Sequence, residues 1–221
     1  GVSFDGTGYG TDGTIWGGEI LLADYQDFTR FGSITPFLQI GGDASAKEGW
    51  RIAVSMIYGF TKDREKAWEI IEKLGLCKVQ FTMADRKINA VMSTSAGRLF
   101  DAVSAILGIR RQSSFEGEAS TALQFAAEAF EQKQTSDLSE RHNIRQELIF
   151  ESEEHCILNT EALVQQIVEA KLQGTDSGAL AYLFHRMLAE QIVAACKAAR
   201  EYSGRNKAAL SGGVFQNRLL L

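Results

Sequence analysis

The chain begins with a short apolar run that ends in an acidic residue, Asp5, and leads at once into a glycine-rich stretch: GVSFDGTGYGTDGTIWGGE. Glycine lets the backbone bend sharply and approach a ligand closely, and successive N–H groups in such a turn can bind phosphate. The pattern therefore predicts a strand, a turn with Asp5 at its edge, and a second strand. An ordinary β-hairpin with a glycine-rich turn is the alternative.

Gly8, Gly10 and Gly13 also fit two nucleotide-binding patterns of the form G-x-G-x-x-G. The dinucleotide pattern requires a helix after the glycines, but TIWGGEILLAD is rich in β-branched and aromatic residues. The protein-kinase pattern requires a lysine on the next strand, and the first lysine here is Lys47. Both patterns are excluded, which favours a phosphate-binding hairpin.

Hydrophobic periodicity divides the chain into three stretches of what we expect to be a single domain over residues 1–221. Residues 1–40 predict strands and turns, 45–131 are mainly helical, and 147–221 combine strands and helices. The polar stretch 132–145 predicts a loop. Within these stretches the apolar spacing predicts helices near 50–57, 67–74, 88–92, 99–107, 119–130, 163–168 and 177–202.

A second glycine motif lies in KAALSGGVFQNRLLL. An apolar strand at 208–210 leads through Gly212 and Gly213 into a predicted helix that carries Val214, Leu219 and Leu220. The start of a helix attracts anions, because its N–H groups and the positive end of its dipole point outward. A plain strand-to-helix turn is the alternative. One acidic hairpin and one late glycine loop are typical of the α/β, ribonuclease H-like fold of actin, sugar kinases and heat-shock ATPases.

Composition excludes several other classes of protein. The net charge of −5 gives no electrostatic reason to expect nucleic acid or an anionic membrane as a partner. No apolar run approaches the roughly 20 residues that span a bilayer. The three cysteines, Cys77, Cys156 and Cys196, lie far apart, which argues against a disulfide framework or a cysteine zinc site and favours the cytoplasm.

Five segments, in this order, resemble the C-terminal carbamoyltransferase domain of the HypF family, which matures [NiFe]-hydrogenases. They are FDGTGYGTDGTIWGGEILLAD, IGGDASAKEGWRIA, STSAGRLFDAVSAILGI, FEGEAS and ALSGGVFQNRLLL. The domain is also similar to the enzymes that make threonylcarbamoyladenosine in tRNA. The resemblance implies that ATP and carbamoyl phosphate give a carbamoyl-adenylate in another domain. This domain would then transfer the carbamoyl group to the C-terminal cysteine of HypE, for the cyanide ligands of the hydrogenase.

The resemblance also implies the site residues. Asp5 would be catalytic and would bind a divalent metal ion, and Gly97 and Arg98 open a helix whose motif is either a cap or functional. Nucleotide binding would fall to the phosphate-side Gly6, Thr7 and Gly8, the ribose-side Gly41, Gly42, Asp43 and Glu48, and the adenosine-side Gly212, Gly213 and Asn217. His142, His155 and His185 match no ligand of the family.

The family's other metal-binding motifs, a histidine pair and an Asp-Gly-Gly sequence, lie outside these 221 residues. Asp5 alone cannot hold a catalytic metal, because such sites need several ligands. We therefore expect an incomplete fragment of the two-lobed fold, inactive by itself, with GVSF and RLLL uncovered. Two other functions stay open: an O-carbamoyltransferase that acts on a small hydroxyl compound, and a scaffold without catalysis.

Overall fold

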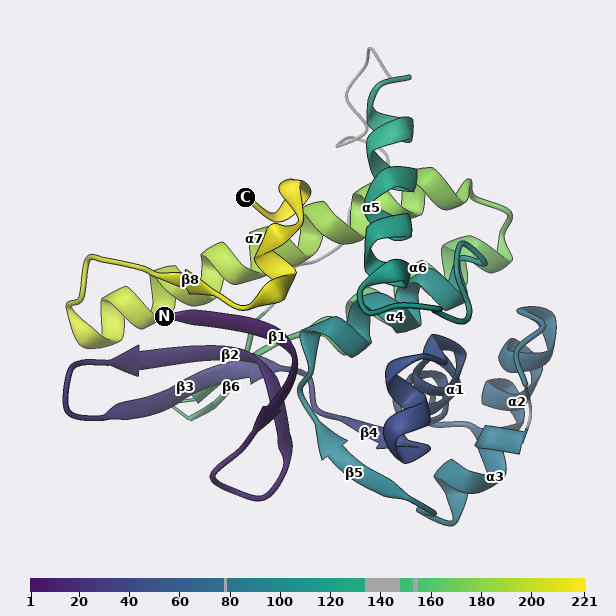
Figure 1. The fold of residues 1–221 in the computed structure, drawn as a ribbon, viewed down its shortest axis with the longest axis horizontal. Coiled ribbons are helices and arrows are strands. Elements are labelled where there is room, and N and C mark those ends of the chain that lie inside the picture. Colours follow the sequence, from purple (N-terminus) through teal and green to yellow (C-terminus); the bar gives the residue numbers. More distant parts are fainter. Residues whose placement is uncertain (78, 134–147, 153–154) are drawn as a thin grey trace.

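The computed structural model describes residues 1–77, 79–133, 148–152 and 155–221, and these form one mixed β-sheet and seven α-helices (Figure 1). The strand order is β4-β5-β2-β3-β7-β6, and β1 pairs with both β2 and β8 outside this path. The strands are β1 (Val2–Tyr9), β2 (Ile15–Ala23), β3 (Phe28–Ile34), β4 (Phe37–Ile40), β5 (Ala90–Ser93), β6 (Leu148–Ser152), β7 (His155–Leu158) and β8 (Leu210–Ser211).

The predicted hairpin is present, but Asp5 lies inside a strand. β1 and β2 are antiparallel, and their register shifts between Phe4 and Gly8. The connecting turn comes later, where the Gly10 N–H donates to the carbonyl of Thr14 at 2.9 Å. The expectation that Asp5 stands at the edge of the turn is therefore wrong. Pairing of Gly8 with Trp16 carries the strand past the first glycines.

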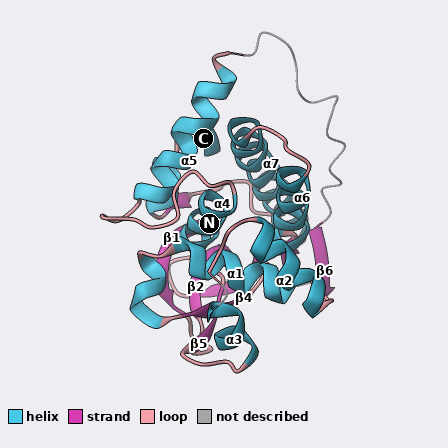
Figure 2. Ribbon diagram, turned by 90° about the vertical axis from the view of Figure 1, so that its right-hand side faces the viewer, coloured by secondary structure: helices cyan, strands magenta, loops and turns pink. Residues whose placement is uncertain are grey.

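Helices cover the sheet, and one of them forms the centre of the core. They are α1 (Gly49–Phe60), α2 (Arg64–Lys73), α3 (Val79–Asp85), α4 (Ala96–Ile106), α5 (Glu118–Glu131), α6 (Thr160–Leu172) and α7 (Ser177–Ser203). A helix that is apolar all round must be buried on every side. In α4, Leu99, Phe100, Val103 and Ile106 are buried, and the helix packs against α1, α5 and β1. Figure 2 shows α6 and α7 side by side above the strands.

Strands from the two end segments of the chain pair with each other. β8 runs parallel to β1, with Val2 opposite Leu210 and Ser3 opposite Ser211 (Figure 1). Val2 and Phe4 are buried, as is Leu220. The expectation that GVSF and RLLL are uncovered is therefore wrong for these residues. The C-terminal segment fills the space beside β1 and α7.

Two predicted helices are absent from the described residues. The segment near 88–92 is the strand β5, which pairs with β2 and β4; positive φ angles at Lys87 and Asn89 separate it from α3. The apolar spacing there covered too few residues to distinguish the two structures. The predicted helix after Gly213 is two short 3₁₀ segments, Gly213–Gln216 and Arg218–Leu220, because Asn217 between them is extended.

The other predicted helices are confirmed as α1, α2, α4, α5, α6 and α7, and Gly75 ends α2 with a φ of 63° as expected for a left-handed cap. The predicted polar loop lies outside the described residues except for residues 132 and 133. His142 lies outside them as well.

Candidate functional site

One cavity of about 560 Å³ gathers predicted residues from both ends of the chain. Asp5 and Gly6 reach it from β1, and Gly213 and Asn217 from the C-terminal segment. The beginning of α4 contributes a further wall, as does the beginning of α5. We call this the β1–α4 cavity.

The irregular part of β1 is locked against the beginning of α4. The Asp5 carboxylate accepts the N–H of Gly6 at 2.8 Å, and the Ser95 hydroxyl donates to the Gly6 carbonyl at 2.7 Å while it caps the N–H of Arg98. A Cβ on Gly97 would lie 2.8 Å from the Cα of Gly6, so only glycine permits this approach. The Asp5 side chain is exposed toward the cavity.

Gly212 and Gly213 have different roles. Gly212 has a φ of 99°, and a Cβ there would lie 2.0 Å from the carbonyl oxygen of Phe4. Glycine at this position lets the C-terminal segment lie on β1. Gly213 has room for a side chain, since a Cβ there would lie 3.7 Å from Oδ1 of Asp5. Gly212 is therefore structural and does not itself line the cavity, whereas Gly213 does.

The Asn217 side chain is held by the protein. Its Nδ2 lies 2.8 Å from Nε2 of His185, and its Oδ1 accepts the N–H of Leu219 at 3.0 Å. His185 on α7 is a core histidine, and its Nδ1 lies 2.7 Å from the carbonyl of Ala181. These contacts fit a neutral ring with a proton on Nδ1. The contact between Asn217 and His185 holds the C-terminal segment against α7.

A buried ion pair forms the α4 wall of the cavity. Nη2 of Arg98 lies 2.9 Å from Oδ2 of Asp101, and both side chains are less than a tenth exposed. Burial raises the pKa of Asp101 to about 6, although the Arg98 charge lowers it in part. A charged pair in an otherwise apolar helix is the sequence signal that could have revealed Asp101, which periodicity alone did not mark. Arg218 and Phe125 also line the cavity and were not predicted.

The opposite pKa shifts of Asp101 and His185 give a test of this arrangement. Burial lowers the pKa of His185 to about 4, from 6.5. His185 therefore stabilises the fold above pH 6.5, and this is lost as the pH falls toward 4. Asp101 stabilises the fold at pH values below 3.8, the ordinary pKa of an aspartate. This stabilisation is lost as the pH rises through 6. Between pH 4 and 6 the two contributions nearly cancel.

In that window, Asp101→Asn should leave the His185 effect unopposed. The free energy of unfolding should then fall on acidification by up to about 1.4 kcal/mol per pH unit more than in the unaltered chain. Urea unfolding between pH 4 and 6 measures this slope. His185→Gln should change the slope in the opposite direction, and equal slopes in all three chains would contradict the two shifts.

The remaining predicted residues do not line the β1–α4 cavity. Gly41 and Gly42 form a tight turn with φ angles of 96° and 55°, Asp43 is exposed in it, and Glu48 forms an ion pair with Arg51. This turn leads into α1, whose Gly49 packs against the backbone of α4: a Cβ on Gly49 would lie 2.7 Å from the carbonyl of Asp101. The turn is therefore connected to α4 through the start of α1.

Thr7 and Gly8 lie farther along β1. Thr7 is exposed, and a Cβ on Gly8 would lie 2.9 Å from the carbonyl of Trp16. Of the predicted phosphate segment, the cavity includes Gly6 alone.

The described residues do not fit a metal ion by themselves. Among them no group of three or more His, Cys, Asp or Glu side chains is placed to hold one. In the cavity, Asp101 is paired with Arg98, so Asp5 and the exposed Glu116 are the other carboxylates there. A divalent cation needs more ligands than these in fixed geometry.

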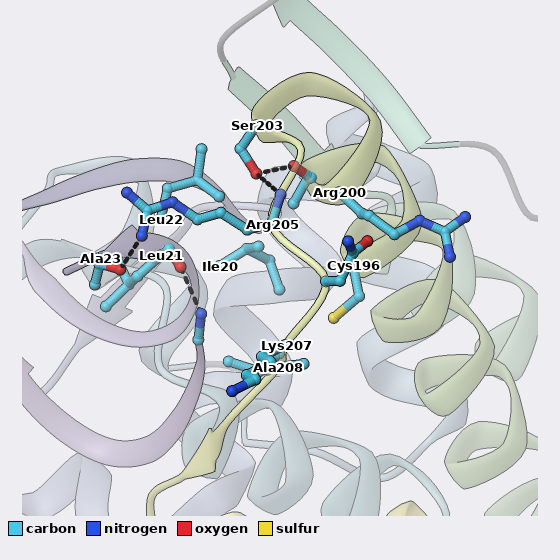
Figure 3. A pocket seen from close by; sticks show the side chains of 14 residues that line it. Ile20, Leu21, Leu22, Ala23, Cys196, Arg200, Ser203, Arg205, Lys207 and Ala208 are labelled. Atoms are coloured by element: carbon cyan, nitrogen blue, oxygen red, sulfur yellow. Dashed lines mark hydrogen bonds between the residues drawn. The ribbon is translucent and has the colours of Figure 1, made fainter.

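A second cavity, of about 450 Å³, lies between β2 and the end of α7 (Figure 3). Arg205 crosses it, donates to the carbonyl of Ala23 at 2.7 Å and pairs with Asp24 at 3.3 Å. This cavity shares no residue with the β1–α4 cavity and includes none of the predicted site residues.

The chain is a carbamoyltransferase domain of the Kae1-like class, because residues 1–221 match the family described as "Carbamoyltransferase, Kae1-like Domain, second subdomain". The chain belongs to this family in its HypF form. It is 31% identical to the probable carbamoyltransferase HypF of Methanocaldococcus jannaschii, over 99% of the chain and 27% of that protein. It is 31% identical to a carbamoyltransferase HypF homolog of Cupriavidus necator, over 100% of the chain and 55% of that protein.

Two solved structures share the fold. Full-length HypF "in the phosphate- and nucleotide-bound form" is similar with a TM-score of 0.80 and 29% identity, over 99% of this chain and 33% of that one. HypF of T. kodakarensis has a TM-score of 0.78 and 29% identity, over 100% of this chain and 29% of that one. The predicted α/β fold class is confirmed. The chain spans about a quarter of the length of the M. jannaschii relative and about half of the length of the C. necator relative. Within the described residues, no helix is both long and apolar enough to cross a membrane.

Proposed function

We propose that this chain is a single domain that binds ATP-derived carbamoyl-adenylate in the β1–α4 cavity and transfers the carbamoyl group to the C-terminal cysteine of HypE. One observation carries the proposal: Asp5, Gly6, Gly213 and Asn217 come from opposite ends of a HypF-family chain and line one cavity. The nucleotide and phosphate in a similar HypF structure support a nucleotide as ligand.

The reaction is an acyl transfer. The cysteine sulfur attacks the carbamoyl carbon, a C–S bond forms, and the bond from that carbon to the phosphate oxygen breaks. AMP leaves with the electron pair, and the thiol proton passes to solvent. The protein must hold the adenylate so that the carbamoyl carbon faces the thiol. The bare backbone at Gly6 and Gly213 permits this close approach, and the exposed Asp5 carboxylate faces the same space.

We place the ribose side of the ligand toward the turn at Gly41, Gly42, Asp43 and Glu48. The helix that follows this turn packs against α4 through Gly49, and the proposal requires the nucleotide to extend past α4 to the turn. We further propose that Asp5 contributes one ligand to a divalent metal whose other ligands come from outside this chain. HypE and the rest of HypF would be its partners, in the cytoplasm.

Carbamoyl transfer by a full-length protein that carries this chain tests the proposal. With ATP, carbamoyl phosphate and HypE, intact-mass spectrometry should show HypE gaining one carbamoyl group. HypE with its C-terminal cysteine replaced by serine should gain none. If HypE stayed unmodified while a small hydroxyl compound became carbamoylated, the O-carbamoyltransferase alternative would hold instead.

A further inference from the structure

The beginning of α4 presents a buried cation to the β1–α4 cavity. Arg98 is 7% exposed and lines the cavity together with Gly97. Its Nη2 would lie 3.7 Å from a Cβ on Gly6, so the guanidinium stands beside the bare backbone of β1. Burial of an arginine is costly unless its charge and its donors are matched.

The protein satisfies the charge and the hydrogen-bond donors of Arg98 only in part. Asp101 neutralises the charge through Nη2, at 2.9 Å. The buried Nε–H has no hydrogen-bond partner among the described residues. A guanidinium has five donors in a planar fork that fits phosphate oxygens, and a buried donor left without a partner costs free energy. Because this Nε is buried, a ligand in the cavity meets the guanidinium at its Nη end, where Nη2 stands beside Gly6.

The carboxylates around the cavity make a fixed cation necessary for an anionic ligand. The exposed carboxylates of Asp5 and Glu116 would repel a phosphate, so a phosphate needs a fixed cation beside them. Arg98 and Arg218 are the arginines that line the cavity. Arg218 is exposed, whereas Arg98 is buried and held by Asp101, so it loses less side-chain freedom on binding.

We propose that Arg98 binds the phosphate of the adenylate, and that Asp101 is a positioning residue that holds the guanidinium toward Gly6. This inference rests on the proposed function. It assigns the phosphate subsite to the wall between α4 and β1, beside Gly6.

Comparison of AMP with adenosine isolates the phosphate contact. Isothermal titration calorimetry of the 221-residue chain should show that Arg98→Gln weakens AMP binding by about tenfold or more and changes adenosine binding less than about twofold. Arg98→Lys keeps the charge but loses the planar arrangement of donors. Its AMP affinity should fall between those of the unaltered chain and of Arg98→Gln. Arg98→Gln combined with Asp101→Asn replaces the ion pair by two neutral amides. If Arg98→Gln alone fails to fold, this double variant replaces it in the test and should show the same selective loss of AMP binding.

Equal losses for AMP and adenosine, or no loss for either, would overturn the role of Arg98. So would an AMP-specific loss in Arg218→Gln that is absent from Arg98→Gln. Failure of the unaltered chain to bind either compound would refute the proposed nucleotide site itself, and Arg98 with it.

Discussion

Replacement of Asp5 by alanine, in a full-length protein that carries this chain, is expected to abolish carbamoyl transfer to HypE. The Asp5 carboxylate is exposed in the β1–α4 cavity, and a Cβ on Gly213 would lie 3.7 Å from its Oδ1. Asp5 contributes little to the stability of the fold, since its side chain accepts a hydrogen bond from the N–H of the neighbouring Gly6. We expect a loss of about a hundredfold or more, as for other residues that act directly on a reacting group.

Two measurements separate this loss from damage elsewhere. ATP-dependent adenylate formation, which we place in another domain, should continue at the rate of the unaltered protein. Asp43→Ala, an exposed aspartate outside the cavity, is the matched control for the substitution. It should weaken nucleotide binding through the proposed ribose contact, without abolishing transfer at saturating nucleotide. Transfer by the Asp5 variant at the normal rate would remove Asp5 from the site.

Gly212→Ala should be among the most damaging single substitutions for the fold. Gly212 has φ 99° and ψ 157°, a conformation almost confined to glycine, and the new Cβ would overlap the carbonyl of Phe4. Strain and the displaced backbone together should lower the free energy of unfolding by about 4 kcal/mol. Urea unfolding of the chain measures it, and the C-terminal segment should detach from β1.

Gly213→Val is the matched control, one residue along the chain. Gly213 does not have a positive φ, and the space beside it is open as far as Asp5. Circular dichroism should show an intact fold, while AMP affinity measured by calorimetry should collapse because the side chain occupies the cavity. An intact affinity would make this loop purely structural. A Gly212→Ala chain as stable as the unaltered one would contradict the close contact with Phe4.

The sequence by itself was sufficient for the features that depend on neighbouring residues. The apolar spacing of α1, α4 and α7 follows from 3.6 residues per turn, and Gly75 has the left-handed conformation expected of a helix end. The ordered glycine motifs indicated the family, because they depend on residue types at fixed short spacings.

Features that depend on contacts between distant segments required the tertiary structure. Ile88, Val91 and Met92 fit one helical turn, but pairing with β2 and β4 makes that segment a strand. Gly212 and Gly213 look alike in sequence, and only the first touches Phe4, at the opposite end of the chain. The sequence marked Arg98 as part of a cap or a site. Its burial beside Gly6, with one donor unmatched, arises only when α4 is packed against β1, because burial and unmet hydrogen bonds are properties of the assembled core.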